Sequence, residues 1–250
     1  MSAAPSIDDT GRCLQRLSVA EGLAREEALL ESICQGEDDF ALLAWSPHDR
    51  ALVMPRRHER LAGFPEAREA LRERGWPIQF RSTGGTPVPQ CPAVVNVALA
   101  QRCRVGSSAA HLEWGYHRLG DPWCEWLAEL GVADPNLGEA PGAYCDGRFN
   151  VRIGERKLVG TAQRWRRVRG GKDMAMLVHG AMQVGETPEA LVTVVNAFQA
   201  AIGDPQRFCP EAHIALEQAV PSLDLEAALP GLLQRLRDFD PVAPGVFGPV

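Results

Sequence analysis

The segment 142–165, GAYCDGRFNVRIGERKLVGTAQRW, contains two apolar runs separated by a short turn. Phe149, Val151 and Ile153 alternate with polar residues, and a second run follows the turn at Gly154. Alternation at period two on both sides of a glycine-containing turn is typical of a β-hairpin. We therefore expect a fold with a sheet that contains this antiparallel pair.

The predicted hairpin places a thiol and an amine near each other. Cys145 lies in the loop that enters it, and Lys157 lies just past its turn. Gly160, inside the second strand, indicates that a ligand or another backbone comes close there. Such a set is suited to acyl transfer. However, a lone cysteine is usually a small buried apolar residue and a lone lysine is usually solvated, so spacing alone leaves both interpretations open.

Patterning along the rest of the chain predicts helices and strands in alternation. Ser18 and Glu21 form a capping box that opens a helix reaching Cys34. Further strands are expected at 40–45, 51–54, 76–81, 94–100 and 174–184, and further helices at 66–75, 108–118, 123–130, 188–202 and, as two helices, within 211–239.

This order predicts one α+β domain over residues 1–250, with a central mixed, largely antiparallel β-sheet flanked by helices. Residues 1–17 are expected to be a loosely held lead-in. Residues 134–142 are expected to be a loop, and 188–250 a helical C-terminal tail.

Composition excludes several classes of function. The net charge of −6 argues against general binding to nucleic acid or to anionic membranes. The chain has no apolar run long enough to span a bilayer and no apolar signal core at its start, so we expect a cytoplasmic protein. Seven cysteines without a CxxC pair and six histidines without an HExxH motif predict neither a disulfide framework nor a metal site.

A glycine pair follows the strand predicted at 76–81. In the segment RSTGGT, Gly84 and Gly85 would let the backbone approach a ligand and present N–H groups to a carboxylate, carbonyl or phosphate. A plain turn is the alternative interpretation. The segment is neither a P-loop nor a dinucleotide-binding motif.

Three segments taken together resemble the lipoate-protein ligase A and octanoyltransferase family over residues 40–184. They are RSTGGTPVPQCP followed by Asn96, then GRFNVRIGERKLVGTAQ, and then His179-Gly180. The resemblance implies a fold shared with biotin protein ligases and an apolar tunnel for an octanoyl or lipoyl chain. It identifies Lys157 as the lysine whose amine contacts the acyl carbonyl. It also implies a substrate site formed by Arg81, Gly84, Gly85, Thr86, Asn96, Gly160, Thr161, Ala162, His179 and Gly180.

The family contains ATP-using ligases and cysteine-using transferases. Ligases typically have an aspartate where this chain has Asn150, and a third glycine where it has Thr86. Cys145 precedes Lys157 by 12 residues, as in the transferase branch, where the cysteine forms an acyl thioester. The resemblance thus implies catalysis by Cys145 and Lys157 without a cofactor. The acceptor would be a lysine of a lipoyl-bearing domain of the 2-oxoacid dehydrogenase or glycine cleavage H protein type. The donor would be an acyl carrier protein or an acylated lipoyl domain.

The sequence leaves alternatives open for the function and for the roles of individual residues. One is an ATP-dependent lipoate-protein ligase, which would need ATP and Mg²⁺, and another is a non-catalytic acyl-binding relative. Cys91 is a rival nucleophile, and His179 could be a satisfied core residue. The basic run 164–172 could dock an acidic partner or be a solvated hairpin edge.

Overall fold

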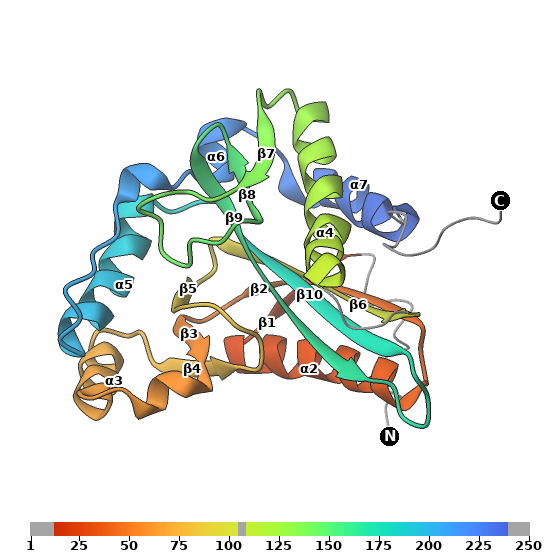
Figure 1. Ribbon diagram of the computed structural model, residues 1–250. Helices are drawn as coiled ribbons and strands as arrows, with labels where there is room; N and C mark the ends of the chain where they lie inside the picture. Colours follow the sequence, from red (N-terminus) through yellow and green to blue (C-terminus); the bar gives the residue numbers. More distant parts are fainter. Residues whose placement is uncertain (1–12, 105–108, 240–250) are drawn as a thin grey trace, which may run out of the picture.

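The computed structural model describes residues 13–104 and 109–239. Its centre is a seven-stranded sheet in which only the first pair of strands is parallel (Figure 1). The strands follow one another in the order β1 (Leu14–Leu17), β2 (Phe40–Pro47), β6 (Val94–Cys103), β10 (Met174–Gln183), β9 (Arg156–Arg167), β8 (Asn150–Ile153) and β7 (Pro135–Gly138). The predicted α+β class and the mixed, largely antiparallel sheet are confirmed.

A smaller sheet of three strands stands beside the large one, in the order β4 (Ile78–Arg81), β3 (Ala51–Pro55) and β5 (Val88–Gln90). The helices are α2 (Val19–Gln35), α3 (Phe64–Glu73), α4 (Ala109–Glu129), α5 (Pro188–Ala201), α6 (Leu216–Ala219) and α7 (Leu225–Asp238), with 3₁₀ turns η1 (Arg56–Arg60) and η2 (Pro210–Ala212). None of the helices in the described ranges is long and apolar enough to cross a membrane.

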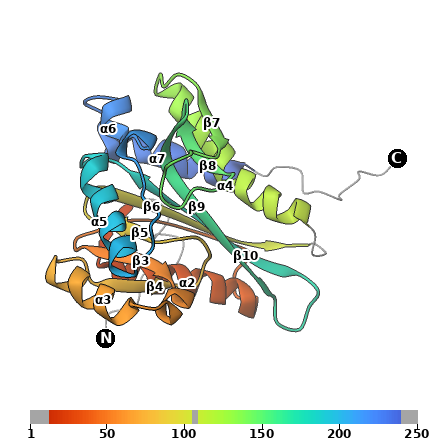
Figure 2. The same ribbon diagram turned by 60° about the vertical axis from the view of Figure 1, so that its left-hand side comes forward.

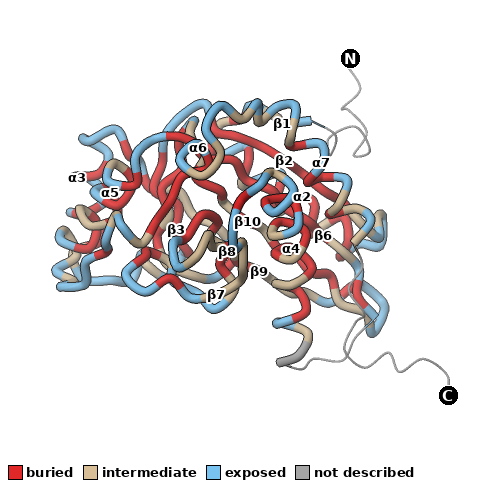
Figure 3. Tube along the Cα trace, turned by 90° about the horizontal axis from the view of Figure 1, so that it is seen from above, coloured by how far each residue is buried: buried red, intermediate tan, exposed pale blue. Residues whose placement is uncertain are grey.

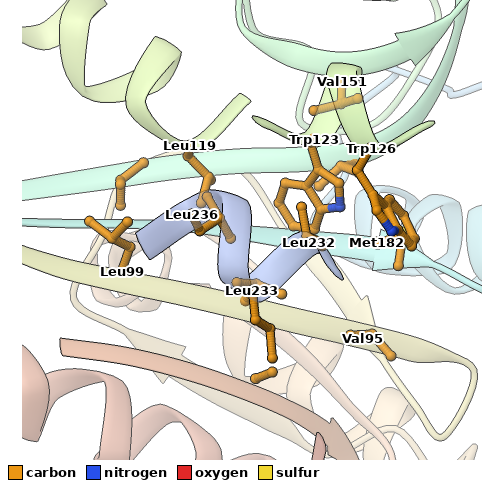
Figure 4. Packing of buried hydrophobic residues seen from close by; sticks show 14 of the residues in the cluster. Val95, Leu99, Leu119, Trp123, Trp126, Val151, Met182, Leu232, Leu233 and Leu236 are labelled. Atoms are coloured by element: carbon orange, nitrogen blue, oxygen red, sulfur yellow. The ribbon is translucent and has the colours of Figure 1, made fainter. Parts of the chain in front are cut away.

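Helices α4 and α7 cover one face of the large sheet. Trp123 and Trp126 of α4 and Leu232 of α7 pack there on Leu99 of β6 and Met182 of β10 (Figure 4). Alternate residues of each strand point to opposite faces, so the apolar side chains at 95, 97 and 99 form this core while 96 and 98 face the other way. All the core side chains named here are buried.

Helix α2 covers part of the opposite face, with Leu30 and Ile33 packed in one cluster with Leu43 of β2 and Leu177 of β10. The capping box predicted for it is present: the Ser18 hydroxyl accepts a hydrogen bond from the main chain three residues on. Helices α3 and α5 pack with the smaller sheet at one side of the molecule (Figures 1 and 2). The buried residues run through the strands at the centre, while exposed residues mark the outer turns (Figure 3).

Three expectations about individual elements are wrong. The lead-in contains an ordered edge strand, β1, which pairs in parallel with β2, although residues 1–12 lie outside the described part. The loop expected at 134–142 contains strand β7. The strands predicted at 40–45 and 51–54 are both present, and they belong to different sheets although only a short turn separates them.

The third wrong expectation concerns α4, which is one continuous helix instead of two, despite Gly120 and Pro122 in its interior. An interior proline costs about 3 kcal/mol, which the burial of two tryptophans on the same helix can offset at about 25 cal/mol per Å². At position 120, a Cβ would lie 2.6 Å from the side chain of Leu137, so the glycine makes room for β7.

Candidate active site

Cys145 lies in the loop before β8 and faces the loop of residues 82–86 that follows β4. This second loop contains Gly84 and Gly85 and is called the glycine loop below. Cys145 is half-buried and has a left-handed backbone with φ of 50°, which is uncommon for a residue with a side chain. Its Sγ accepts a hydrogen bond from the Thr86 N–H at 3.4 Å. A Cβ at Gly85 would lie 2.8 Å from the sulfur, so only glycine lets Sγ lie this close to the loop. The structure therefore brings together two segments that the sequence could only suggest separately.

Lys157 lies on the second residue of β9 and is buried, with 4% of its surface exposed. Its Nζ donates hydrogen bonds to the carbonyl oxygens of Tyr144, at 2.6 Å, and Cys145, at 2.9 Å. A Cβ at Gly160 would lie 3.0 Å from Lys157 Cε and 3.1 Å from Nζ. The close approach predicted at Gly160 thus exists, but it is made by the lysine side chain rather than by another backbone.

Charge in this site favours the thiolate. Burial alone raises the pKa of the Cys145 thiol, but the positive charges of Lys157 and Arg81 and the hydrogen bond from Thr86 outweigh it, so the net pKa lies below the ordinary value. Burial lowers the pKa of Lys157 to about 8, against the opposing pull of the Cys145 and Asp146 charges. The two groups therefore stabilise each other as a thiolate and an ammonium.

The Arg81 side chain holds the glycine loop in place by hydrogen bonds to its carbonyl oxygens. Its guanidinium donates to the carbonyl oxygens of Gly84 at 2.8 Å, Thr86 at 2.9 Å and Val53 at 3.3 Å. Because five N–H donors lie in one rigid plane, a single arginine can hold several carbonyl groups in fixed positions. Arg81 thus shapes the loop and supplies positive charge to Cys145.

A narrow pocket of about 30 Å³ extends from Cys145 along the sheet. It shares Leu23, Glu26, Arg81 and His179 with an open cleft of about 710 Å³ that also contains Gly84. The pocket's small and apolar walls suit a hydrocarbon chain, although its present volume is that of only one or two water molecules. Its lining includes Val53, Val88, Asn96, Gly160, Thr161, Ala162 and Ala181.

His179 is held in the pocket wall by hydrogen bonds on both ring nitrogens. Nδ1 lies 2.6 Å from Glu26 Oε2 and Nε2 lies 2.9 Å from Thr83 Oγ1, while Trp45 Nε1 donates to the other Glu26 oxygen at 2.9 Å. This network connects α2, β10 and the glycine loop. Sequence reasoning missed Glu26, although an acidic residue on the apolar face of α2, four residues before Leu30, is a usable signal.

The other predicted residues are placed as follows. Asn96 exchanges two hydrogen bonds with Gln90, at 2.8 and 3.0 Å, in a buried amide pair on the pocket wall. The Thr161 hydroxyl donates to the carbonyl oxygen of Phe149 at 2.8 Å. Gly180 is not brought to the site: a Cβ there would lie 2.2 Å from the ring of Trp123, so this glycine makes room for the core on the opposite face.

Two further candidates from the sequence are also placed. Cys91 is fully buried in the cluster beneath the smaller sheet, and burial raises the pKa of its thiol, which does not suit a nucleophile. In the basic run, Arg164 forms an ion pair with Glu27 of α2, and Arg166 forms ion pairs with Glu27 and Glu31. These two arginines are therefore partly neutralised within the chain, which favours the interpretation as a charged hairpin edge.

Comparison with known proteins assigns the chain to a family. Residues 18–230 match the model of the lipoyl protein ligase A/B catalytic domain. The chain therefore belongs to the lipoyl protein ligase A/B catalytic domain family.

Relatives and solved structures agree with this assignment. An uncharacterized protein of Cupriavidus necator is 31% identical, over 80% of this chain and 81% of that protein. The octanoyl-[GcvH]:protein N-octanoyltransferases of Kyrpidia tusciae and Geobacillus kaustophilus are 31% and 30% identical, over 72% and 60% of this chain. The matches span only 62% and 51% of those two enzymes.

The fold is similar to that of a lipoate-protein ligase A bound with ATP, with a TM-score of 0.66, 18% identity and coverage of 90% of this chain and 84% of that one. It is also similar to a putative lipoate protein ligase from Thermoplasma acidophilum with bound lipoic acid, with a TM-score of 0.67, 20% identity and coverage of 91% and 84%.

Proposed function

We propose that this chain transfers an octanoyl or lipoyl group, through a thioester on Cys145, to a lysine of a lipoyl-bearing protein. The observation that carries the proposal is the pairing of Cys145 Sγ, seated against the Thr86 N–H, with the buried ammonium of Lys157. This pairing lowers the pKa of the thiol and so increases the fraction present as the nucleophilic thiolate. The names of the two octanoyltransferases support the same type of reaction.

In the first half-reaction, the Cys145 thiolate attacks the acyl carbonyl carbon of the donor. A bond forms between Sγ and that carbon, and the bond to the donor's sulfur or nitrogen breaks. The Lys157 ammonium, with a pKa of about 8, can give a proton to the leaving group near neutral pH. Two of its three N–H groups are bound to carbonyl oxygens, so one remains for the acyl oxygen.

In the second half-reaction, the amine of the acceptor lysine attacks the thioester. The new bond joins nitrogen to the acyl carbon, and the Cys145 thiolate leaves. The proton lost by the attacking amine returns to Lys157, so both groups regain their starting states. Neither half-reaction as written needs ATP or a metal.

The acyl chain would occupy the narrow pocket between Cys145 and His179. That pocket must widen to admit eight carbons, and the Thr83–His179 hydrogen bond, which connects the glycine loop to β10, lies where the pocket meets the open cleft. Asn150, at the position where ligases typically have an aspartate, is buried and its Nδ2 lies 3.5 Å from the carbonyl oxygen of Cys145. Here it supports the cysteine loop.

The test is the intact mass of the protein after incubation with octanoyl carrier protein or with octanoylated H protein, without ATP. The wild type should gain one octanoyl group that hydroxylamine removes, and a lipoyl domain added next should accept it. Cys145→Ala should show no gain, while the control Cys13→Ser, which removes an exposed cysteine, should behave as the wild type.

Which donor loads Cys145 identifies the physiological donor class. If neither donor loads the protein and a lipoyl domain is acylated only from free acid plus ATP, the transferase proposal is wrong and the ligase alternative holds. Binding of octanoate without any transfer in either assay would support the non-catalytic alternative.

A further inference from the structure

Thr86 contacts Cys145 through its main chain, and the proposed mechanism so far gives no role to its side chain. Its N–H donates to Cys145 Sγ, and its carbonyl oxygen accepts from Arg81 at 2.9 Å. Its hydroxyl oxygen is buried, yet within the described residues it has no hydrogen-bond partner. Burying a hydroxyl without a partner is unfavourable, and most buried polar atoms in proteins are paired. A partner that arrives during the reaction would explain this arrangement.

The position of Thr86 suits a donor to the reacting carbonyl. The N–H donates to the sulfur at 3.4 Å, and the Oγ–H, although it forms no hydrogen bond of ordinary geometry, lies near enough to be the weakest of the influences that lower the thiol pKa. When Sγ bonds to the acyl carbon, the developing oxyanion is attached to the atom next to the sulfur. Donors that reach Sγ from the loop can therefore reach that oxygen, and a thioester sulfur competes for them less than a thiolate does.

We propose that the Thr86 hydroxyl is an oxyanion-hole donor that acts together with the Thr86 N–H. The hydroxyl donates a hydrogen bond to the carbonyl oxygen as the Sγ–C bond forms. It gives up that bond when the oxyanion collapses and the bond to the leaving group breaks. Thr86 neither gains nor loses a proton over the cycle. The inference rests on the proposed role of Cys145 as the nucleophile.

The test compares Thr86→Val, which replaces the hydroxyl by a methyl group of similar size, with Thr86→Ser, which keeps a hydroxyl. p-Nitrophenyl octanoate acylates Cys145 through an oxyanion and does not depend on the natural donor. Iodoacetamide alkylates the same sulfur without forming an oxyanion. Acylation should fall about 100-fold or more in Thr86→Val and stay within about tenfold in Thr86→Ser, because losing one such donor typically costs that much.

Alkylation is the control, and in Thr86→Val it should stay within about threefold of the wild type, because the hydroxyl is the weakest influence on the thiol pKa and the larger ones, from Lys157, Arg81 and the Thr86 N–H, remain. Removing an unpaired buried hydroxyl should leave the melting temperature equal or higher. If Thr86→Val proves poorly folded, Thr86→Ala removes the same donor without adding a methyl group and is compared with Thr86→Ser.

Two outcomes would overturn the inference: acylation of Thr86→Val at the wild-type rate, or equal losses of acylation and alkylation, which would place the hydroxyl's effect on the thiol itself. The proposed function fails in a different way. In that case the wild type would react with the ester but pass no octanoyl group to any lipoyl-bearing acceptor, and the comparison of Thr86 variants would still be decided.

Discussion

Two glycines determine how closely the thiol and the amine of this site can approach the backbone. Gly85 leaves space for the Cys145 sulfur, and Gly160 leaves space for the end of the Lys157 side chain. A Cβ at position 160 would meet only the end of the Lys157 side chain, and one at position 85 would meet both the Cys145 sulfur, at 2.8 Å, and the Arg81 guanidinium, at 2.7 Å. The electrostatic pairing that lowers the pKa of Cys145 therefore depends on two residues that have no chemistry of their own.

Replacing Gly160 by alanine should weaken this pairing without removing any charged group. In the wild type, alkylation of Cys145 should rise with pH through a midpoint below the ordinary thiol range, because the thiol pKa is lowered. Gly160→Ala pushes the Lys157 amine away, so the midpoint should move to higher pH, and the rate below it should fall about tenfold for each unit of that shift.

The matched control is Gly147→Ala in the loop after Cys145, where a new Cβ would meet no atom within 4 Å. The rate at which iodoacetamide alkylates Cys145 should be measured as a function of pH, from about pH 5 to about pH 9. Acyl transfer itself should also decline above about pH 8, as Lys157 loses its proton. An unchanged alkylation midpoint in Gly160→Ala would show that Lys157 does not set the thiol pKa.

Among the residues of the site, the sequence predicted those that stand in a local motif and missed those that the fold brings in from a distant segment of the chain. Cys145, Lys157 and the glycine loop were identified because each stands in a motif. Glu26 enters the site from α2, and its role becomes visible only when β10 brings His179 beside it. Gly180 lies away from the pocket for a simple reason: neighbours on a strand point to opposite faces, so His179 faces the pocket while Gly180 faces the core.

The segment between α5 and α6 lies outside the predicted site and holds the loop that contains Cys145 in place. The chain between α5 and α6 donates the Cys209 N–H to the carbonyl oxygen of Gly142 at 2.8 Å. It also places His213 against Tyr144, with stacked rings 4.3 Å apart and the Tyr144 N–H donated to His213 Nε2 at 3.3 Å. Burial, with the nearby charge of Lys157, lowers the pKa of His213 to about 3. The imidazole thus remains a neutral acceptor at every pH where the enzyme would work.

His213 should therefore act as a positioning residue for the Tyr144–Cys145 peptide. His213→Leu removes the acceptor and should reduce acyl transfer by about 100-fold, since small displacements of a reacting group can cost this much. His213→Gln retains an acceptor and should recover much of the rate. Both variants should be compared by acylation rate, by the pH midpoint of Cys145 alkylation and by melting temperature. Equal activity of the leucine variant and the wild type would contradict this role.

At the scale of elements, patterns predicted the hairpin, the capping box and the strands that became β6 and β10, because each is specified by adjacent residues. The division of strands between two sheets was not predictable in this way. Phe40–Pro47 and Ala51–Pro55 are separated by one short turn, which normally signals a hairpin, but the first pairs with β1 and β6 and the second with β4 and β5. The continuity of α4 likewise depends on tertiary packing that overrides local helix-breaking residues.

The three larger apolar clusters of the described residues lie one on each face of the large sheet and one beneath the smaller sheet. Helix α7, near the C-terminal end of the described residues, is part of the first cluster. Leu229, Leu232, Leu233 and Leu236 of this helix are almost fully buried, and the Trp126 Nε1 donates to the carbonyl oxygen of Ala228 at 3.2 Å. We therefore predict that the helical C-terminal part and the site-bearing sheet form one cooperative unit.

Truncating one of these leucines tests that prediction. Leu232→Ala leaves a cavity against α4 and should lower the free energy of unfolding by about 2–5 kcal/mol. Urea unfolding should be followed by tryptophan fluorescence, to which three of the six tryptophans contribute from α4, and by the reaction of the fully buried Cys91 with a thiol reagent, which reports on the cluster beneath the smaller sheet. In a single domain both signals should shift together to lower urea, because no part of the fold can open alone.

Leu112→Ala is the matched control, because that leucine of α4 is 50% exposed and its loss should change the free energy by no more than about 0.5 kcal/mol. The transfer rate per folded molecule should be unchanged in both variants, since neither side chain lines the pocket. A Leu232→Ala variant in which fluorescence shifts while Cys91 remains protected up to the wild-type urea concentration would divide the chain into two units. In that case α7 and its cluster would be an accessory to the catalytic sheet instead of part of its core.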